Sequence, residues 1–142
     1  MRIALCMLAA VLFAASGCDS TLVPRENLTP GDVEGTYVGS AEIADGLASR
    51  FTMTLTPTAG ATSGTEANAT AGNLDIEGLL LHNSVEYAMT GSGVFEYPSV
   101  SLAAKAPSFG DDGFSFALTA DASGTVLQGE VNGQFIKLDK QR

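Results

Sequence analysis

Over residues 33–142, apolar side chains recur at every second position in short runs that end at Gly, Asn or Asp. Phe51, Met53 and Leu55 alternate with threonines, and residues 114–118 repeat the pattern. Successive side chains of a β-strand point to opposite faces, so this spacing is typical of strands with one buried face. No window in this stretch keeps an apolar stripe at helical spacing. The sequence therefore predicts an all-β domain over residues 33–142.

The breaks in the alternation divide this domain into about eight to ten short antiparallel strands. They are predicted at residues 35–43, 51–56, 61–67, 74–81, 85–90, 94–97, 100–103, 114–118, 125–131 and 136–139. Gly, Asn and Ser predict tight turns at residues 83–84, 91–93, 122–124 and 132–133. A sheet of consecutive hairpins leaves the fewest unpaired edges when it curls shut. We therefore expect one antiparallel meander, either a closed barrel or a barrel-like sandwich.

In a closed sheet the apolar phase of every strand converges on one interior. The predicted core consists of Tyr37, Phe51, Met53, Leu55, Leu74, Ile76, Val85, Tyr87, Met89, Leu102, Phe114, Phe116, Leu118, Ile136 and Leu138. Large aromatic residues favour a filled interior. Small residues also fall on the inward phase and leave space at one end of the barrel. They are Gly39, Ala41, Ala104 and Gly129. A calyx for one small apolar ligand is therefore the alternative.

One segment departs from simple alternation. Leu79 and Leu81 fall out of phase with Leu74 and Ile76, and Gly78 lies between the two pairs. An extra residue in one strand shifts its register, and glycine is common at such sites. The segment therefore predicts a β-bulge at Gly78.

The N-terminus has the layout of a secretory signal. Arg2 supplies a positive charge, residues 3–15 are apolar or small, and small residues follow. The apolar run is too short to span a bilayer comfortably, and no charged stop-transfer cluster follows it. A cleaved signal peptide over residues 1–17 is therefore predicted.

The end of this signal resembles a lipobox. Ala15-Ser16-Gly17-Cys18 is similar to the site at which bacterial lipoproteins are cut before a cysteine that then carries acyl chains such as palmitate. The resemblance implies lipidation of Cys18 and attachment to a membrane of the cell envelope, facing the periplasm or the exterior. The alternative is an ordinary secretory signal with a free Cys18. Asp19 resembles the inner-membrane retention signal of enteric bacteria, but other bacteria sort differently, so inner and outer membrane both stay open.

Residues 18–32 are predicted to be a flexible tether, because they contain Pro24 and Pro30 and have no periodicity. Removal of residues 1–17 takes away Arg2 and changes the formal net charge from −9 to −10. This acidity argues against binding to nucleic acid or lying flat on anionic lipid, and it permits a basic protein partner.

No catalytic residue, metal site or cofactor is predicted, and the ligand-binding residues are left open. His82, the only histidine, is interpreted as a solvated turn residue. Residues 110–113, Gly-Asp-Asp-Gly, lack the spaced acidic ladder of a calcium loop and are interpreted as a turn. Glutamates on the polar phase are interpreted as solvated side chains rather than acid-base pairs; they are Glu42, Glu77, Glu86, Glu96 and Glu130. The chain is therefore not predicted to be an enzyme.

Gly35-Thr36-Tyr37 resembles the Gly-x-Trp opening of lipocalin and avidin barrels, with tyrosine in place of tryptophan. The resemblance implies an aromatic side chain that closes the barrel floor. Residues 35–39, 51–56 and 126–133 resemble small bacterial lipoproteins with a meander β domain, which implies no site. Together these features predict a lipid-anchored cell-envelope protein with a non-catalytic binding or structural barrel, able to hold a small apolar ligand. The alternative is a protein-binding module, such as an inhibitor of a basic envelope enzyme.

Overall fold

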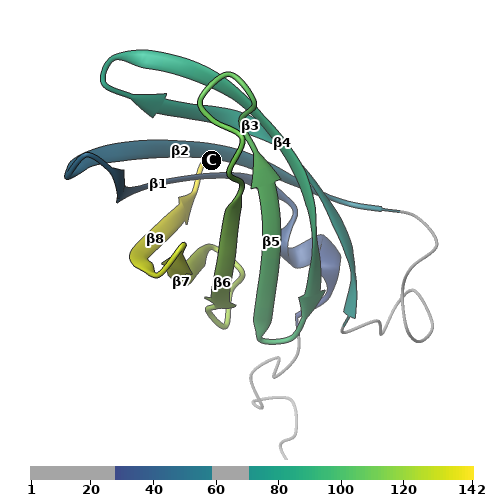
Figure 1. Ribbon diagram of the computed structural model, residues 1–142. Coiled ribbons are helices and arrows are strands. Elements are labelled where there is room, and N and C mark those ends of the chain that lie inside the picture. The colour runs from purple at the N-terminus through teal and green to yellow at the C-terminus, as the bar shows by residue number, and fades with distance from the viewer. Residues whose placement is uncertain (1–27, 59–70) are drawn as a thin grey trace, which may run out of the picture.

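The computed structural model describes residues 28–58 and 71–142. A short 3-10 turn precedes eight strands that form one closed barrel, and each strand pairs antiparallel with the next one along the chain (Figure 1). The predicted meander is confirmed as a barrel, while the strand predicted at 61–67 lies outside the described residues. The elements are η2 (Pro30–Val33), β1 (Gly35–Ala44), β2 (Leu47–Pro57), β3 (Ala71–His82), β4 (Val85–Glu96), β5 (Ser99–Lys105), β6 (Phe114–Ala120), β7 (Val126–Val131) and β8 (Gln134–Lys140).

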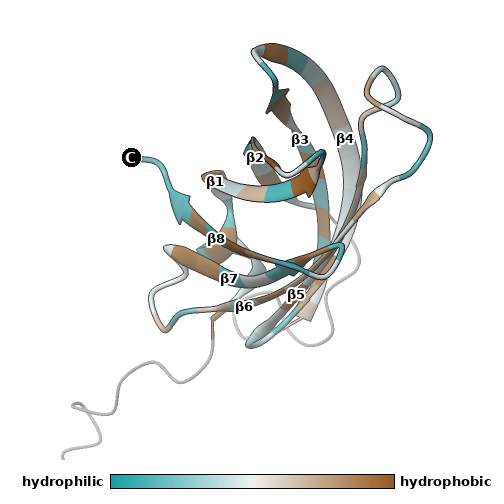
Figure 2. Cartoon of the chain, turned by 60° about the vertical axis from the view of Figure 1, so that its left-hand side comes forward, coloured by the Kyte–Doolittle hydropathy of each residue, from teal (hydrophilic) through white to brown (hydrophobic). Residues whose placement is uncertain are grey.

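The strands bury alternate residues, as the sequence pattern predicts. Every inward residue of β6 is buried and every outward one is exposed, and apolar and polar positions alternate along the ribbons in Figure 2. The predicted core residues are buried, except that Tyr87 is half-buried and Val85 is 49% exposed. Val85 was wrongly predicted because it lies at the tip of the β3–β4 hairpin, beyond Thr90, where the pairing of β4 with β5 ends.

β3 is more regular than predicted. It pairs with β2 and β4 without any shift in register, so the predicted bulge at Gly78 is wrong. Leu80, in phase with Leu74 and Ile76, is buried, whereas Leu79 is 43% exposed. Three adjacent leucines obscured the phase, and the buried one is the middle residue.

The turn predicted at residues 91–93 is also wrong, because β4 runs unbroken through both glycines. Adding a Cβ atom at these glycines would bring it closer than 3.0 Å to a backbone carbonyl oxygen of the next strand, so they permit a close approach of two strands. Glycines placed in this way let a sheet bend as it closes. The same contact with a neighbouring strand occurs at three further inward glycines, Gly39, Gly78 and Gly129.

The chain enters the barrel at one end, and its last tether residues are folded there. The tether was predicted to run through Asp32, but Leu28 and Pro30 are buried. Asp32 accepts hydrogen bonds from the backbone N–H and the hydroxyl of Thr29, at 2.7 and 2.9 Å, and this capping box explains the ordered turn. The barrel closes within residues 28–142, so a chain that begins at Asp19 keeps the complete fold. No helix among the described residues is long and apolar enough to span a membrane.

Tyr37 closes this end of the barrel. It is completely buried, and its hydroxyl donates to the carbonyl oxygens of Gly124, at 2.7 Å, and Val33, at 3.0 Å. Burial, and then the nearby Asp121 carboxylate, raise the pKa of Tyr37, so the phenol keeps the proton that it donates. The Tyr37 side chain therefore links η2 to the β6–β7 turn across the closed end of the barrel.

Lys140 reinforces the same end from β8. Its ammonium group donates to the carbonyl oxygen of Asp32 at 3.0 Å and lies 5.7 Å from the centre of the Tyr37 ring. Lys140 pairs with Tyr37, and Asp139 with Val38, where β8 meets β1. The contacts at this closed end therefore lie where β8 pairs with β1 and completes the barrel.

Asp121 organises the β6–β7 turn beneath Tyr37. Its carboxylate accepts hydrogen bonds from the backbone N–H groups of Thr125 and Val126, at 2.8 and 2.9 Å, and from the Ser123 hydroxyl, at 2.5 Å. Burial alone would raise the pKa of Asp121, but these hydrogen bonds outweigh it and hold the pKa below its usual 3.8. The ionised carboxylate is therefore the form that stabilises the turn.

We expect Asp121→Ala to lower the free energy of unfolding by about 1–3 kcal/mol at pH 7, because it leaves two turn N–H groups without their acceptor. A carboxyl group whose pKa is lowered on folding contributes stability above its unfolded pKa, and this contribution is lost as the pH falls through the folded pKa. Urea titrations of both proteins should therefore converge below pH 3.8. Asp111→Ala, an exposed loop change, is the control. If Asp121→Ala lowered the free energy of unfolding equally at pH 7 and at pH 3, the charge of Asp121 would have no role in the turn.

Candidate functional site

The interior of the barrel is filled by its own aromatic side chains. The Phe51 ring lies 5.4 Å from that of Phe114 and 5.3 Å from that of Phe116, with both pairs nearly perpendicular, and all three are buried. Of the small residues predicted to leave space, Ala41 and Ala104 are buried. At Gly39 and Gly129, the backbone of a neighbouring strand occupies the space that a side chain would take. This packing favours a filled core over a calyx at this level of the barrel.

His82 lies at the other, open end of the barrel and is only 7% exposed, so the prediction of a solvated turn residue is wrong. It is the last residue of β3 and keeps the inward phase of Leu80. Its Nδ1 atom and the Ser49 hydroxyl share a hydrogen bond of 2.6 Å, and Ser49 is completely buried. No buried polar side-chain atom in the described part lacks a partner, so the Nε2 atom of His82 reaches the surface.

Phe109 packs over this open end from the loop between β5 and β6. Its ring centre lies 5.2 Å from that of His82, 5.1 Å from that of Tyr87 and 5.9 Å from that of Phe114. Turn hydrogen bonds from the N–H groups of residues 109 and 110 to the Ala106 carbonyl oxygen hold the loop in place. Phe109 was not predicted from the sequence, because it belongs to no alternating run. A lone aromatic among Pro, Gly and Asp was the available signal.

The Ser49 hydroxyl is inaccessible to a substrate, and within the described residues no carboxylate is hydrogen-bonded to His82. No group of three or more metal-ligating side chains occurs in that part of the chain. The five polar-phase glutamates and Gly110–Gly113 are exposed, as predicted. Cys18 lies outside the described residues.

A groove of about 690 Å³ runs along the outer wall beside the open end. Its volume lies in the range typical of small-molecule sites, and its residues come from the middle of β4, the end of β5, the adjoining loop and the start of β6. It is lined by Thr90, Gly91, Ser92, Ala103, Ala104, Lys105, Pro107, Gly113, Phe114 and Ser115.

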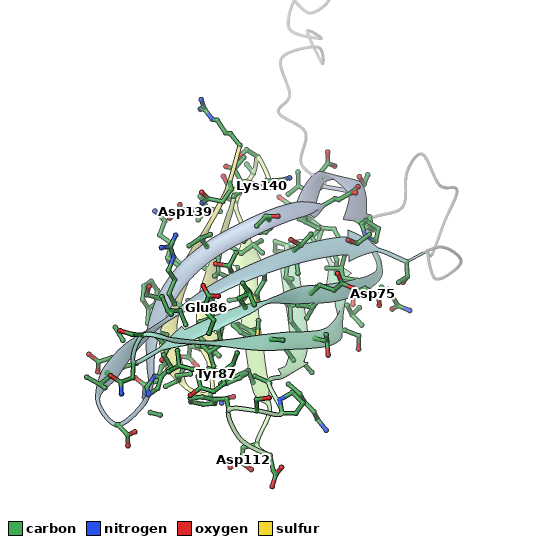
Figure 3. All side chains as sticks on the ribbon, turned by 90° about the horizontal axis from the view of Figure 1, so that it is seen from above. Asp75, Glu86, Tyr87, Asp112, Asp139 and Lys140 are labelled. Carbon is green, nitrogen blue, oxygen red and sulfur yellow. The ribbon has the colours of Figure 1, made fainter. Side chains whose placement is uncertain are left out.

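The outer wall of β3 and β4 is acidic. Asp75 and Glu77 on β3 and Glu86 and Glu96 on β4 are exposed, and none of the four forms an ion pair with a described residue. Figure 3 shows Asp75 and Glu86 on this wall, and it shows Lys140 and Asp112 on opposite sides of the barrel. The wall runs from the closed end, where β3 begins and β4 ends, to the tip of the β3–β4 hairpin.

No protein-family model matches this chain, and no curated protein matches it. Among solved structures, a redesigned β-barrel is similar, with a TM-score of 0.54 and 18% sequence identity, over 82% of this chain and 99% of the redesigned one. At that identity the likeness shows the fold alone, a β-barrel.

Proposed function

We propose that this chain is a lipid-anchored protein of the cell envelope whose barrel is a non-catalytic binding domain, with the outer groove as its site. The observation that carries the binding role is the groove itself, an indentation of ligand size on a barrel whose interior is filled. Support for the anchor comes from the lipobox-like stretch that ends at Cys18.

The anchor and the groove are compatible in space. The roughly ten residues between Cys18 and Leu28 extend at most about 35 Å, and Leu28 packs at the closed end of the barrel. A lipid on Cys18 therefore keeps the closed end within about 35 Å of the membrane. The groove lies near the other end of the barrel and is not covered by this attachment.

Mass spectrometry of the protein from the membrane fraction tests the anchor. We expect an N-terminal peptide that begins at an acylated Cys18. Cys18→Ala should leave the chain unprocessed or release it from the membrane. An unmodified Cys18 at the mature N-terminus, or a retained signal, would contradict lipidation.

Native mass spectrometry of the protein purified from its own membranes tests the binding role. We expect a small molecule to remain bound and to be lost from Ala103→Trp, which fills the groove. Ala117→Trp, an exposed change on β6 outside the groove, is the matched control and should retain it. A ligand retained equally by both variants would exclude the groove as the site.

A basic protein partner is the second candidate, supported by the four unpaired acidic side chains on the wall of β3 and β4. Electrostatic attraction between exposed surfaces weakens as salt rises. A pull-down from envelope extract should therefore recover a basic protein at low salt that is lost at high salt. Recovery should also fall when Asp75, Glu77 and Glu86 are replaced by their amides. Failure to recover a salt-sensitive partner counts against this candidate.

A further inference from the structure

Lys105 places a positive charge in the groove of a strongly acidic chain. Within the described residues it forms no ion pair, whereas Lys137 pairs with Asp139 at 3.4 Å. The Lys105 stem runs beside Gly113, where a Cβ atom built on the glycine would lie 3.5 Å from the lysine Cγ atom. The stem therefore lies along the edge of the groove, and its charge is available to a bound group.

The remainder of the lining divides into hydroxyl groups and apolar surface. The hydroxyls of Thr90, Ser92 and Ser115 form no hydrogen bond with any described residue. Pro107 and Ala103 provide the exposed apolar part, and Phe114, which is 5% exposed, lies beneath them. A ligand that fits this surface combines one negative charge with an apolar body.

We propose that the groove binds a small amphipathic organic anion, a monocarboxylate with an apolar chain. This proposal rests on the binding role proposed above and adds the chemical class of the ligand. The carboxylate lies against the Lys105 ammonium group and the nearby hydroxyls, and the chain lies against Pro107 and Ala103.

Charge complementarity favours an anion over a cation or a neutral molecule. A cation would be repelled by the Lys105 ammonium group, and a neutral molecule would gain no electrostatic attraction from it. Asp111 and Asp112 belong to the adjacent loop but are exposed and do not line the groove. The negative charge of the rest of the chain opposes anion binding elsewhere on its surface, so the site should be selective.

Calorimetric titration of the chain that begins at Asp19 tests the ligand class. Three probes share one chain length: sodium octanoate, 1-octanol and octyltrimethylammonium. We expect octanoate to bind most tightly, at one per chain. Lys105→Met, which keeps the stem and removes the charge, should weaken octanoate binding about threefold to fivefold. The same change should leave octanol binding unaltered.

Two variants separate the possible results. Ala103→Trp should abolish binding of octanoate and octanol, and Lys137→Met, which removes a charge outside the groove, should alter neither. Octanol binding as tightly as octanoate, with Ala103→Trp abolishing both, would overturn the anion class and leave the binding groove standing. An equal effect of Lys105→Met and Lys137→Met would also overturn the anion class. No binding of any probe would overturn both proposals.

Discussion

Replacing Phe116 with alanine is expected to lower the free energy of unfolding by about 3–5 kcal/mol. The Phe116 ring is almost completely buried and packs edge to face against Phe51 at 5.3 Å. Its removal leaves a cavity that the closed sheet relaxes into only in part, since every strand is hydrogen-bonded on both sides. Urea denaturation followed by circular dichroism gives the value.

Phe135→Ala is the matched control, because this phenylalanine on β8 is 64% exposed. Its loss should stay within about 0.5 kcal/mol. If Phe116→Ala fails to fold, Phe116→Leu provides a smaller measurable loss of the same sign. A loss from Phe116→Ala no larger than that from Phe135→Ala would mean that the interior has room to spare, as in a calyx.

Gly129→Ala is expected to lower the free energy of unfolding by about 1–3 kcal/mol, although alanine is normally tolerated better than glycine in a strand. The added Cβ atom would lie closer than 3.0 Å to the Ala117 carbonyl oxygen and the Leu118 Cα atom. Both contacts are with backbone, so relief requires strands β6 and β7 to move apart. Urea denaturation measures the loss.

Gly110→Ala is the control for this change, since Gly110 is an exposed loop residue with no atom within 4 Å of a built Cβ. It should change the free energy of unfolding by no more than about 0.5 kcal/mol. Equal effects at the two positions would show that the inward glycines do not set the bend of the sheet.

Strand identity could be predicted where the pattern is local. Phe114, Phe116 and Leu118 reveal a half-buried strand because period-2 alternation depends only on neighbours in the sequence. Glycine was misread because it serves two purposes. At Gly133 it stands in a turn with φ +81, whereas at Gly91 it stands inside a strand. Only the position of the facing strand distinguishes the two cases.

The residues at the open end and those that line the groove could not be predicted in the same way, because closure of the barrel brings them together. His82 and Ser49 lie on neighbouring strands, and their contact depends on the register of β2 with β3. Phe109 reaches His82 from a loop that carries no periodic signal. The groove depends likewise on the meeting of β4, β5 and β6, so Lys105 looked like any exposed lysine in the sequence.

A fluorescence titration distinguishes ligand binding in the outer groove from binding inside the barrel. The chain that begins at Asp19 is titrated with an apolar probe whose emission rises on leaving water. We predict saturable one-to-one binding that Ala103→Trp abolishes and that Phe116→Leu leaves unchanged. Binding that survives Ala103→Trp but is altered by Phe116→Leu would place the ligand in the interior. That result, or the absence of saturable binding, would exclude the outer groove as the binding site.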